Sequence, residues 1–523
     1  MGPSRTYSIK GVAATLAGLA LLAVIFAASV TWNHAQVIVP LQEGGSLVVL
    51  ADGDCQSRMH RAAMVASHPG TIVRAHDFEN FPEGTVPHTT APMDYLIAGL
   101  AIATPSFDLA GAWISPLLGL LTVIFLWFWS RRLDLRPRWP MLLLFCVSPA
   151  LTHAFALGRP DHQSLLAALT TVALTANMAF LRTQSASWAW TSGAAWGLAL
   201  WVSWFEPLIL LAAQEIACGL VLRRAAWPTA RRRALLLAIV FALISWALEG
   251  FRSPWPSSDV RELFPRWASL LGELQPASPR ALFAWTGWLL VPAPLLLVWE
   301  YLRRRDPLAM ICLVLLVVVT ALTGWQARWS PWLASVFCLS LPWILRPLQR
   351  SWIIWAVFSA SLWPVAGEWE ARLFPEESEQ ARRSGNIAEA AMLEETAAFL
   401  RSQPPGGVLA PWWISPALAR LGNHPMVGGT SHQSLPGSAD TARFFLTGNW
   451  ETAAAILRDR KVDYVVSDAP ERILPTSAVL LGIEAPEHPV AVRLARGKDL
   501  PSFLQPVFAN AYFRVYKVDH ERL

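Results

Sequence analysis

The amino-acid sequence predicts a polytopic α-helical membrane protein with a C-terminal α+β soluble domain. Three observations predict this fold class. Apolar residue types make up 54% of the 523 residues and charged types only 15%, against roughly 25% charged residues in an average soluble domain. Long apolar runs, separated by short arginine clusters, fill the first two thirds of the chain. The mean hydropathy of +0.38 excludes a cytosolic enzyme, a disordered chain and a disulfide scaffold.

The apolar runs give the expected membrane spans. Eleven segments qualify: residues 11–32, 108–130, 139–157, 162–181, 188–204, 207–222, 234–249, 281–300, 307–323, 330–346 and 351–367. Several are shorter than a straight span requires, so we expect about 11–13 transmembrane helices. The first run follows Arg5 and Lys10, and no clear small-residue cleavage site comes after it. We interpret it as an uncleaved anchor and not as a signal peptide.

The arginine clusters predict the orientation. With the N-terminus inside, the cytoplasmic loops carry Arg131, Arg132, Arg136, Arg138, Arg182, Arg223, Arg224, Arg231 to Arg233, Arg303 to Arg305, Arg346 and Arg350. Such a bias is the positive-inside rule. We therefore expect a multi-pass protein of the plasma (inner) membrane, surrounded by the lipid bilayer. Because the basic residues form short clusters and no continuous stripe, we expect no nucleic-acid partner.

Two domains follow from this topology. Residues 1–367 are expected to form the transmembrane domain, with outer loops 33–93 and 250–280, and residues 368–523 an extracytoplasmic α+β domain. In the second domain, the apolar run VDYVVSD (462–468) predicts a strand. The stretch NIAEAAMLEETAAFL (386–400) predicts a helix.

Acidic residues in the outer turns are the first candidates for chemistry. Asp52 and Asp54 follow the apolar run SLVVL in the first loop. Asp161 and His162 lie in LGRPDHQS (157–164), a short outward turn between two spans. Carboxylates so placed can coordinate a hard divalent cation, although ordinary solvated turns would have the same composition.

The second outer loop and one span end add two more candidates. Glu273 lies in LLGELQP (270–276), with Glu262 as its local rival, and Arg328 lies in GWQARWSP at the outer end of a span. A lone arginine there can also extend to the lipid head groups. Under the predicted topology, the carboxylates and the arginine all fall on one membrane face. They could therefore converge on one cation.

Other ionisable residues are interpreted as structural. Glu206 and Glu215 lie within or beside apolar runs and are expected to pair inside the helix bundle. Four histidines of the first loop match no zinc-binding spacing. Surface or loop-packing roles are expected for them: His60, His68, His76 and His88.

These motifs resemble those of the catalytic subunit family of oligosaccharyltransferase, membrane glycosyltransferases of the GT-C type, in a divergent bacterial form. Asp54 stands in the position of the family's catalytic aspartate, with Asp52 just before it. Asp161 matches the first acid of the second acidic motif, and Gln163 stands where a second ligand or acid is usual.

The later motifs continue this resemblance in the same order. Glu273 matches the glutamate of the family's Ser-x-x-Glu loop, and Arg328 matches the arginine that lies beside the peptide. APWWISP (410–416) resembles the Trp-Trp-Asp signature through Trp412 and Trp413. Ile414 replaces the signature's aspartate, which in the family reads the Ser/Thr of the acceptor sequon. The resemblance therefore supports the fold and a lipid-linked donor better than an Asn-x-Ser/Thr acceptor.

The resemblance implies a transferase that moves a glycan from a polyprenyl (pyro)phosphate carrier to an acceptor on the outer face. A protein is the first expectation for this acceptor. It implies catalytic roles for Asp54, Asp161, Glu273 and Arg328, Mg or Mn binding by Asp54, Asp161 and Glu273, and acceptor binding by Trp412 and Trp413. Asp52, His162 and Gln163 are possible additional ligands. The alternatives are transfer of a single sugar to a lipid or cell-surface polymer, a transporter, or a non-catalytic scaffold.

Overall fold

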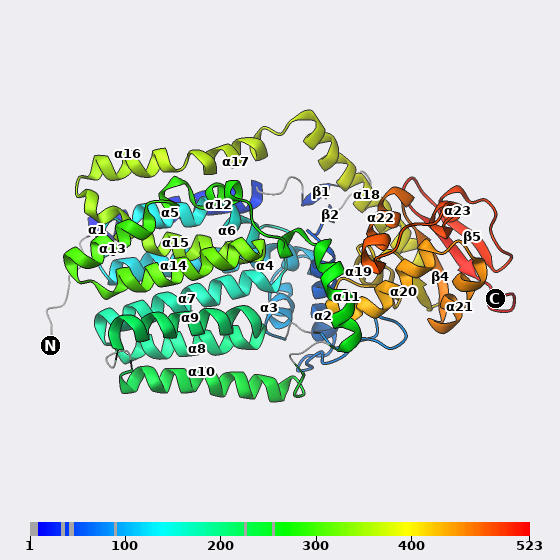
Figure 1. Ribbon diagram of the computed structural model, residues 1–523, viewed down its shortest axis with the longest axis horizontal. Coiled ribbons are helices and arrows are strands. Elements are labelled where there is room, and N and C mark those ends of the chain that lie inside the picture. Colours follow the sequence, from blue (N-terminus) through cyan, green and yellow to red (C-terminus); the bar gives the residue numbers. More distant parts are fainter. Residues whose placement is uncertain (1–8, 33–36, 41–45, 88–90, 224–226, 254–256) are drawn as a thin grey trace.

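The computed structural model describes residues 9–32, 37–40, 46–87, 91–223, 227–253 and 257–523. Figure 1 shows a bundle of long helices that lie side by side, with a smaller domain of helices and strands at one end of the bundle. His88, one of the histidines of the first loop, lies outside the described residues.

Among the described residues, six helices are long and apolar enough to cross a membrane. They are Ala13–Trp32 within α1 (Ile9–Trp32), α4 (Phe107–Arg132), α7 (His162–Thr183), α9 (Phe205–Leu222), α14 (Pro307–Trp325), and Ala327–Leu348, which contains α15 (Ser330–Leu345). Two more predicted segments form α8 (Ala186–Val202) and α10 (Thr229–Leu248), and α8 packs between α7 and α10. The predicted polytopic α-helical fold is confirmed.

Three segments predicted as continuous spans are broken in the structure. They form α5 (Trp139–Val147) and α6 (Pro149–Ala154), then α12 (Pro279–Thr286) and α13 (Ala293–Arg304), then α16 (Ser351–Ser361) and α17 (Trp363–Leu373). Pro149 and Pro364 lack the N–H that would continue the preceding helix, so each lies in the first turn of a new one. Gly287, at φ +84°, separates α12 from α13 in a conformation that favours glycine.

The two long loops that were expected to face outward contain more structure than their polar composition suggested. The first holds the antiparallel pair β1 (Ile38–Pro40) and β2 (Ser46–Val48) and then α2 (Gly53–Ser67), and α3 (Ala91–Ala101) begins at its end. The second holds α11 (Ser258–Ser269) and the short 3-10 helix η2 (Gly272–Leu274). In Figure 1, α2 and α11 lie at the junction between the bundle and the C-terminal domain.

The C-terminal domain is built on a four-stranded sheet of order β3-β4-β6-β5. Its strands are β3 (Gly407–Leu409), β4 (Val462–Ser467), β5 (Leu504–Ala509) and β6 (Arg514–Val518); β3 is parallel to β4, and the other pairs are antiparallel. Its helices are α18 (Glu377–Arg401), α19 (Ser415–Gly422), α20 (Leu435–Leu446), α21 (Trp450–Asp459), α22 (Pro470–Leu481) and α23 (Val490–Arg496). The predicted strand and helix are confirmed as β4 and part of α18. The domain boundary predicted at residue 367 falls inside α17, which packs against α12 of the bundle.

The arginine-rich loops meet at one end of the bundle. Asp306 forms ion pairs with Arg182, at 2.9 Å, and with Arg346, at 3.6 Å. Arg182 lies at the end of α7, whose first residue, His162, borders the site described below. A helix of 22 residues is about 33 Å long. The basic loops and the site are therefore separated by about one membrane thickness.

Candidate active site

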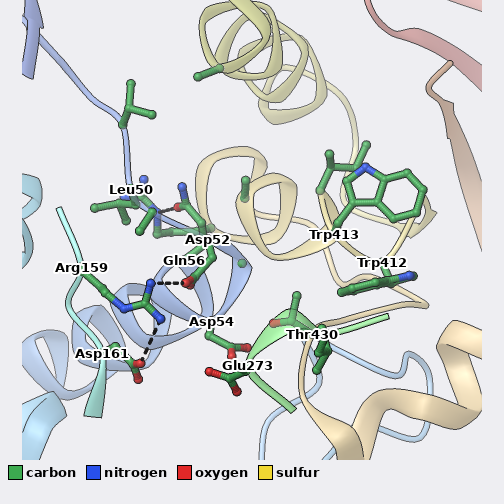
Figure 2. A pocket seen from close by; sticks show the side chains of 18 of the residues that line it. Leu50, Asp52, Asp54, Gln56, Arg159, Asp161, Glu273, Trp412, Trp413 and Thr430 are labelled. Carbon is green, nitrogen blue, oxygen red and sulfur yellow. Dashed lines mark hydrogen bonds and ion pairs between the residues drawn. The ribbon is translucent and has the colours of Figure 1, made fainter. Parts of the chain in front are cut away.

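A cavity of about 750 Å³ lies where the ends of the bundle helices meet the C-terminal domain. Every predicted site residue borders it: Asp52, Asp54, Asp161, His162, Gln163, Glu273, Arg328, Trp412 and Trp413. Figure 2 shows several of these side chains pointing into the same space from different elements. The structure therefore brings together residues that lie more than 300 positions apart in the sequence.

Backbone hydrogen bonds hold the two acidic turns against each other. The N–H of Ala51 donates to the carbonyl oxygen of Gly158 at 3.0 Å. Asp52 is the N-cap of α2 and accepts a bond from the Cys55 N–H at 2.9 Å, the usual role of aspartate at this position. The side chain of Asp54, two residues further on, therefore points from the first turn of α2 into the cavity.

The C-terminal domain closes tightly on this turn at Gly53. A Cβ atom on Gly53 would lie 2.4 Å from Cγ2 of Thr430, closer than any real contact. Thr430 is buried and borders the cavity beside Asp54. Thr430 is a site residue that the sequence analysis missed, and only tertiary packing reveals it.

Asp54 carries an unusual charge environment. Its side chain is exposed to the cavity, while protein surrounds the carboxylate on its other sides. Burial, together with the negative charges of Asp52, Asp161 and Glu273, raises the pKa of Asp54 to about 8. Asp54 has no ion-pair partner among the described residues. Such a perturbed carboxyl in a cleft is typical of functional sites.

Asp161 is held in the charged form. One oxygen, Oδ1, lies 2.6 Å from Nδ1 of His162, and Oδ2 faces the guanidinium of Arg159 at 3.7 Å. Burial alone would raise the pKa of Asp161, but His162 and Arg159 outweigh it and hold the pKa well below its ordinary range. Asp54 and Asp161 thus differ in protonation tendency although they border one cavity.

Arg159 is the second site residue that the sequence analysis missed. Its guanidinium lies between Asp52, at 3.4 Å, and Asp161, and its side chain is 11% exposed. Burial lowers the pKa of Arg159, but the two aspartates outweigh this effect and raise it above the ordinary value. The available signal was an arginine in a turn predicted to face outward, against the general bias of the chain.

Gln163 and Glu273 meet in the structure. The Gln163 amide donates a hydrogen bond of 3.2 Å to Oε2 of Glu273 on η2. Glu262, the alternative weighed for this loop, is exposed on α11 and does not border the cavity. Gln163 therefore links the start of α7 directly to Glu273 on η2.

Arg328 borders the cavity but pairs with the bundle. Its guanidinium donates to Glu206 Oε1, and it lies over the ring of Phe205 at 5.8 Å from the centroid. Glu215 pairs with Arg231 at 2.7 Å. The interpretation that both glutamates pair inside the bundle is confirmed.

The paired tryptophans form the wall of the cavity on the C-terminal domain. Trp412 and Trp413 pack edge to face, with ring centroids 5.8 Å apart, and the Trp413 indole donates to Asp468 at 3.2 Å. Ile414 is buried. The hydroxyl of Ser415 donates to the carbonyl oxygens of Ala410 and Pro411 and is fully buried, so it offers the cavity no hydrogen-bonding group.

The donor set suits a hard divalent cation in its chemistry. Asp54, Asp161 and Glu273 present carboxylate oxygens to one cavity, and Mg and Mn prefer oxygen ligands. Asp54 itself has no ion-pair partner among the described residues, and it lies beside the negative charges of Asp52, Asp161 and Glu273; this is the observation that favours a cation there. Among the described residues, however, no group of three or more His, Cys, Asp or Glu side chains is arranged to hold one metal ion.

The comparisons with known proteins give a clear result for the fold. No family model matches the chain, and no curated protein matches it in sequence. Solved structures of GT-C membrane glycosyltransferases do match. The sequence identities to these structures are only 12–16%, so the likeness shows the fold alone. The chain has the GT-C fold. The predicted resemblance is confirmed at this level.

Three of these structures illustrate the likeness. The oligosaccharyltransferase AglB from Archaeoglobus fulgidus, in complex with an inhibitory peptide and a dolichol-phosphate, has a TM-score of 0.64 and 15% identity over 93% of this chain and 73% of its own. Its complex with Zn and sulfate gives 0.64 and 15% over 89% and 70%. ArnT from Cupriavidus metallidurans, bound to undecaprenyl phosphate, gives 0.56 and 12% over 97% and 98%.

Proposed function

We propose that this protein is a membrane glycosyltransferase that moves a glycan from a polyprenyl phosphate or pyrophosphate carrier to an acceptor on the outer face of the membrane. The observation that carries the proposal is the acidic cavity bordered by Asp54, Asp161 and Glu273 in a chain with the GT-C fold. Support for the carrier comes from the solved structures with this fold, which contain dolichol-phosphate and undecaprenyl phosphate.

Each side chain has a role in this proposal. Asp54, Asp161 and Glu273 would hold a Mg or Mn ion, and such an ion would supply positive charge to stabilise the departing phosphate. Gln163 orients Glu273 through its hydrogen bond. Arg328, fixed by its ion pair with Glu206, positions the acceptor or the donor.

The acceptor is proposed to be a protein that is recognised without a strict sequon. Reading a Ser/Thr hydroxyl specifically requires a buried polar partner. Here Ile414 is apolar and the Ser415 hydroxyl is occupied by backbone carbonyls. Trp412 and Trp413 then provide an apolar wall for the acceptor. The same observation favours the alternative, transfer of one sugar to a lipid or cell-surface polymer.

The test uses the purified protein in nanodiscs with lipid extract from the native cell and a divalent cation. Mass spectrometry identifies what becomes glycosylated, and release of carrier phosphate gives the rate. We expect Glu273→Ala to lower transfer by at least about 100-fold, as loss of a group that stabilises transition-state charge does. Glu262→Ala, the matched control in the same loop, should leave the rate unchanged. Equal rates for the two variants would contradict the proposed site.

A peptide panel separates the acceptor classes. Fluorescent Asn-x-Thr, Asn-x-Ala and Asn-x-Val peptides are offered with the native donor. Comparable transfer to all three, or transfer only to a non-peptide acceptor, is expected from the missing hydroxyl reader. Strong transfer to the Thr peptide alone would show a strict sequon reader.

A further inference from the structure

A positively charged side chain already lies between the two acidic turns. Arg159 faces Oδ2 of Asp52 at 3.4 Å and Oδ2 of Asp161 at 3.7 Å (Figure 2). The Ser115 hydroxyl donates to the Arg159 carbonyl oxygen and lies 2.9 Å from the Ser164 hydroxyl. The backbone at Arg159 is thus fixed, while its long side chain ends at the wall of the cavity.

The Arg159 contacts are longer than strong ionic hydrogen bonds. Charge-assisted N–H to carboxylate bonds measure about 2.7–2.9 Å. Several other arginines of this chain reach such lengths, among them Arg58 to Asp94 at 2.8 Å and Arg420 to Asp108 at 2.7 Å. Arg159 reaches neither aspartate so closely, and its Nε has no hydrogen-bond partner among the described residues. The guanidinium of Arg159 is therefore held by electrostatic attraction to the two aspartates and not by a pair of short hydrogen bonds.

Asp161 cannot serve Arg159 and a divalent cation equally well. Its Oδ1 is occupied by His162 at 2.6 Å, so Oδ2, which faces Arg159, is the oxygen left for a metal. A metal–oxygen bond of about 2.0–2.6 Å would bring the cation close to the guanidinium. Two positive charges at such a distance repel each other strongly in a buried site.

We propose that Arg159 is an exchangeable counter-ion of the acidic cavity. It neutralises Asp52 and Asp161 when no divalent cation is bound, and it must release Asp161 before the cation binds. Arg159 is therefore a positioning residue that sets how tightly the metal is held. This inference rests on the proposed function, because it takes a divalent cation to be part of the transfer site.

The test measures metal binding and does not depend on turnover. Full-length protein in nanodiscs is titrated with Mn²⁺, and the free ion is followed by electron paramagnetic resonance. An opposite charge within about 4–6 Å of a carboxylate changes its proton affinity by roughly 10-fold or more. We therefore expect Arg159→Gln to bind Mn²⁺ about 10-fold more tightly than the native chain.

Three further variants make the result specific. Arg472→Gln removes the same charge from the same cavity, but Arg472 contacts Glu389 and Asp468. The affinity of this variant for Mn²⁺ should therefore stay near the native value. Arg159→Lys keeps the positive charge but lacks the planar guanidinium. It should bind Mn²⁺ more tightly than the native chain, by a smaller factor than Arg159→Gln. Because a lysine side chain fits the same space, this variant preserves the test if Arg159→Gln does not fold. Asp161→Asn should abolish the tight site.

The outcomes separate the inference from the proposed function. Equal or weaker Mn²⁺ binding by both Arg159 variants, at a site that Asp161→Asn removes, overturns the counter-ion role and leaves the cation-assisted function standing. Equal tightening by Arg472→Gln also overturns it, because overall charge would then be the cause. If no form of the protein binds Mn²⁺ at a site sensitive to Asp161→Asn, the metal in the proposed function is itself wrong.

Discussion

At the scale of single residues, burial decides which histidines of the first long loop (residues 33–93) can become charged. His60 and His76 stack in parallel on Phe78, with ring centroids 4.1 and 3.6 Å away. This contact confirms the loop-packing role expected for these two histidines. Burial, with help from nearby arginines, lowers the pKa of His60 to about 4 and that of His76 to about 2. Both rings are therefore neutral in the folded protein at physiological pH.

The stability of this loop should fall on acidification. Because the folded pKa of His60 is below its unfolded value, the unfolded chain binds more protons from about pH 6.5 down to about pH 4. The free energy of unfolding should therefore decrease as the pH falls through this window, by up to about 1.4 kcal/mol per pH unit for one histidine. His60→Phe keeps the aromatic stack without the titrating group, and its thermal unfolding should depend less on pH.

The control for this experiment is His68→Phe, because His68 is exposed. Its unfolding, followed by tryptophan fluorescence at pH 6.5, 5.5 and 4.5, should retain the native pH dependence. An unchanged slope for His60→Phe would show that His60 is not the group responsible.

At the scale of elements, a loop of the C-terminal domain fixes the start of α2. Glu79 accepts hydrogen bonds from the hydroxyl groups of Ser57 on α2 and of Ser431 next to Thr430, the latter at 2.7 Å. This link presses Thr430 against Gly53, between the two aspartates of the first turn. The position of Asp54 therefore depends on a segment that lies almost 400 residues further along the chain.

This contact can be tested by adding one methyl group at Gly53 and then removing the methyl group of Thr430 that it would meet. Gly53→Ala places a Cβ 2.4 Å from Thr430 Cγ2 and should cost about 1–3 kcal/mol through overpacking, with a matching loss of transfer activity. Thr430→Ser removes Cγ2 and keeps the hydroxyl, so the double variant Gly53→Ala/Thr430→Ser should recover most of the stability. If the double variant unfolds as readily as Gly53→Ala alone, the steric explanation is wrong.

The sequence predicts elements better than it predicts their contacts. Spans and the strand β4 follow from local hydrophobicity, which is why they could be located in advance. The breaks at Pro149 and Gly287 need the backbone geometry. Arg159 and Thr430 were missed because their roles arise from neighbours in space. Glu273 was chosen over Glu262 from a motif likeness, and the structure gives the physical difference: only Glu273 borders the cavity.

At the scale of the whole molecule, the two ends of the bundle differ in charge. Arg182 and Arg346, from two of the basic loops, pair with Asp306 at one end, and the acidic cavity lies at the other end of α7 beside the C-terminal domain. Under the positive-inside rule, the basic end is cytoplasmic. The proposed transfer would then take place on the outer face.

Cysteine labelling tests this orientation directly. All five native cysteines are buried, which keeps the background low. Ser258→Cys and Ser402→Cys, both at exposed positions near or within the C-terminal domain, should react with an impermeant maleimide added outside intact cells. Ser187→Cys, exposed in the arginine-rich α7–α8 region, should react only after the cells are opened. The reverse pattern would invert the topology and place the cavity in the cytoplasm.

The closure of the cavity by Thr430 also has a consequence for biosynthesis. A ribosome completes the bundle helices long before it reaches residue 430, and domains generally fold in the order of synthesis. Until the last third of the chain has emerged and docked, Asp54 lacks the wall that holds it. A nascent or truncated chain would then insert into the membrane without the assembled catalytic centre. In the proposed function, transfer would then have to wait until the C-terminal domain has docked on α2.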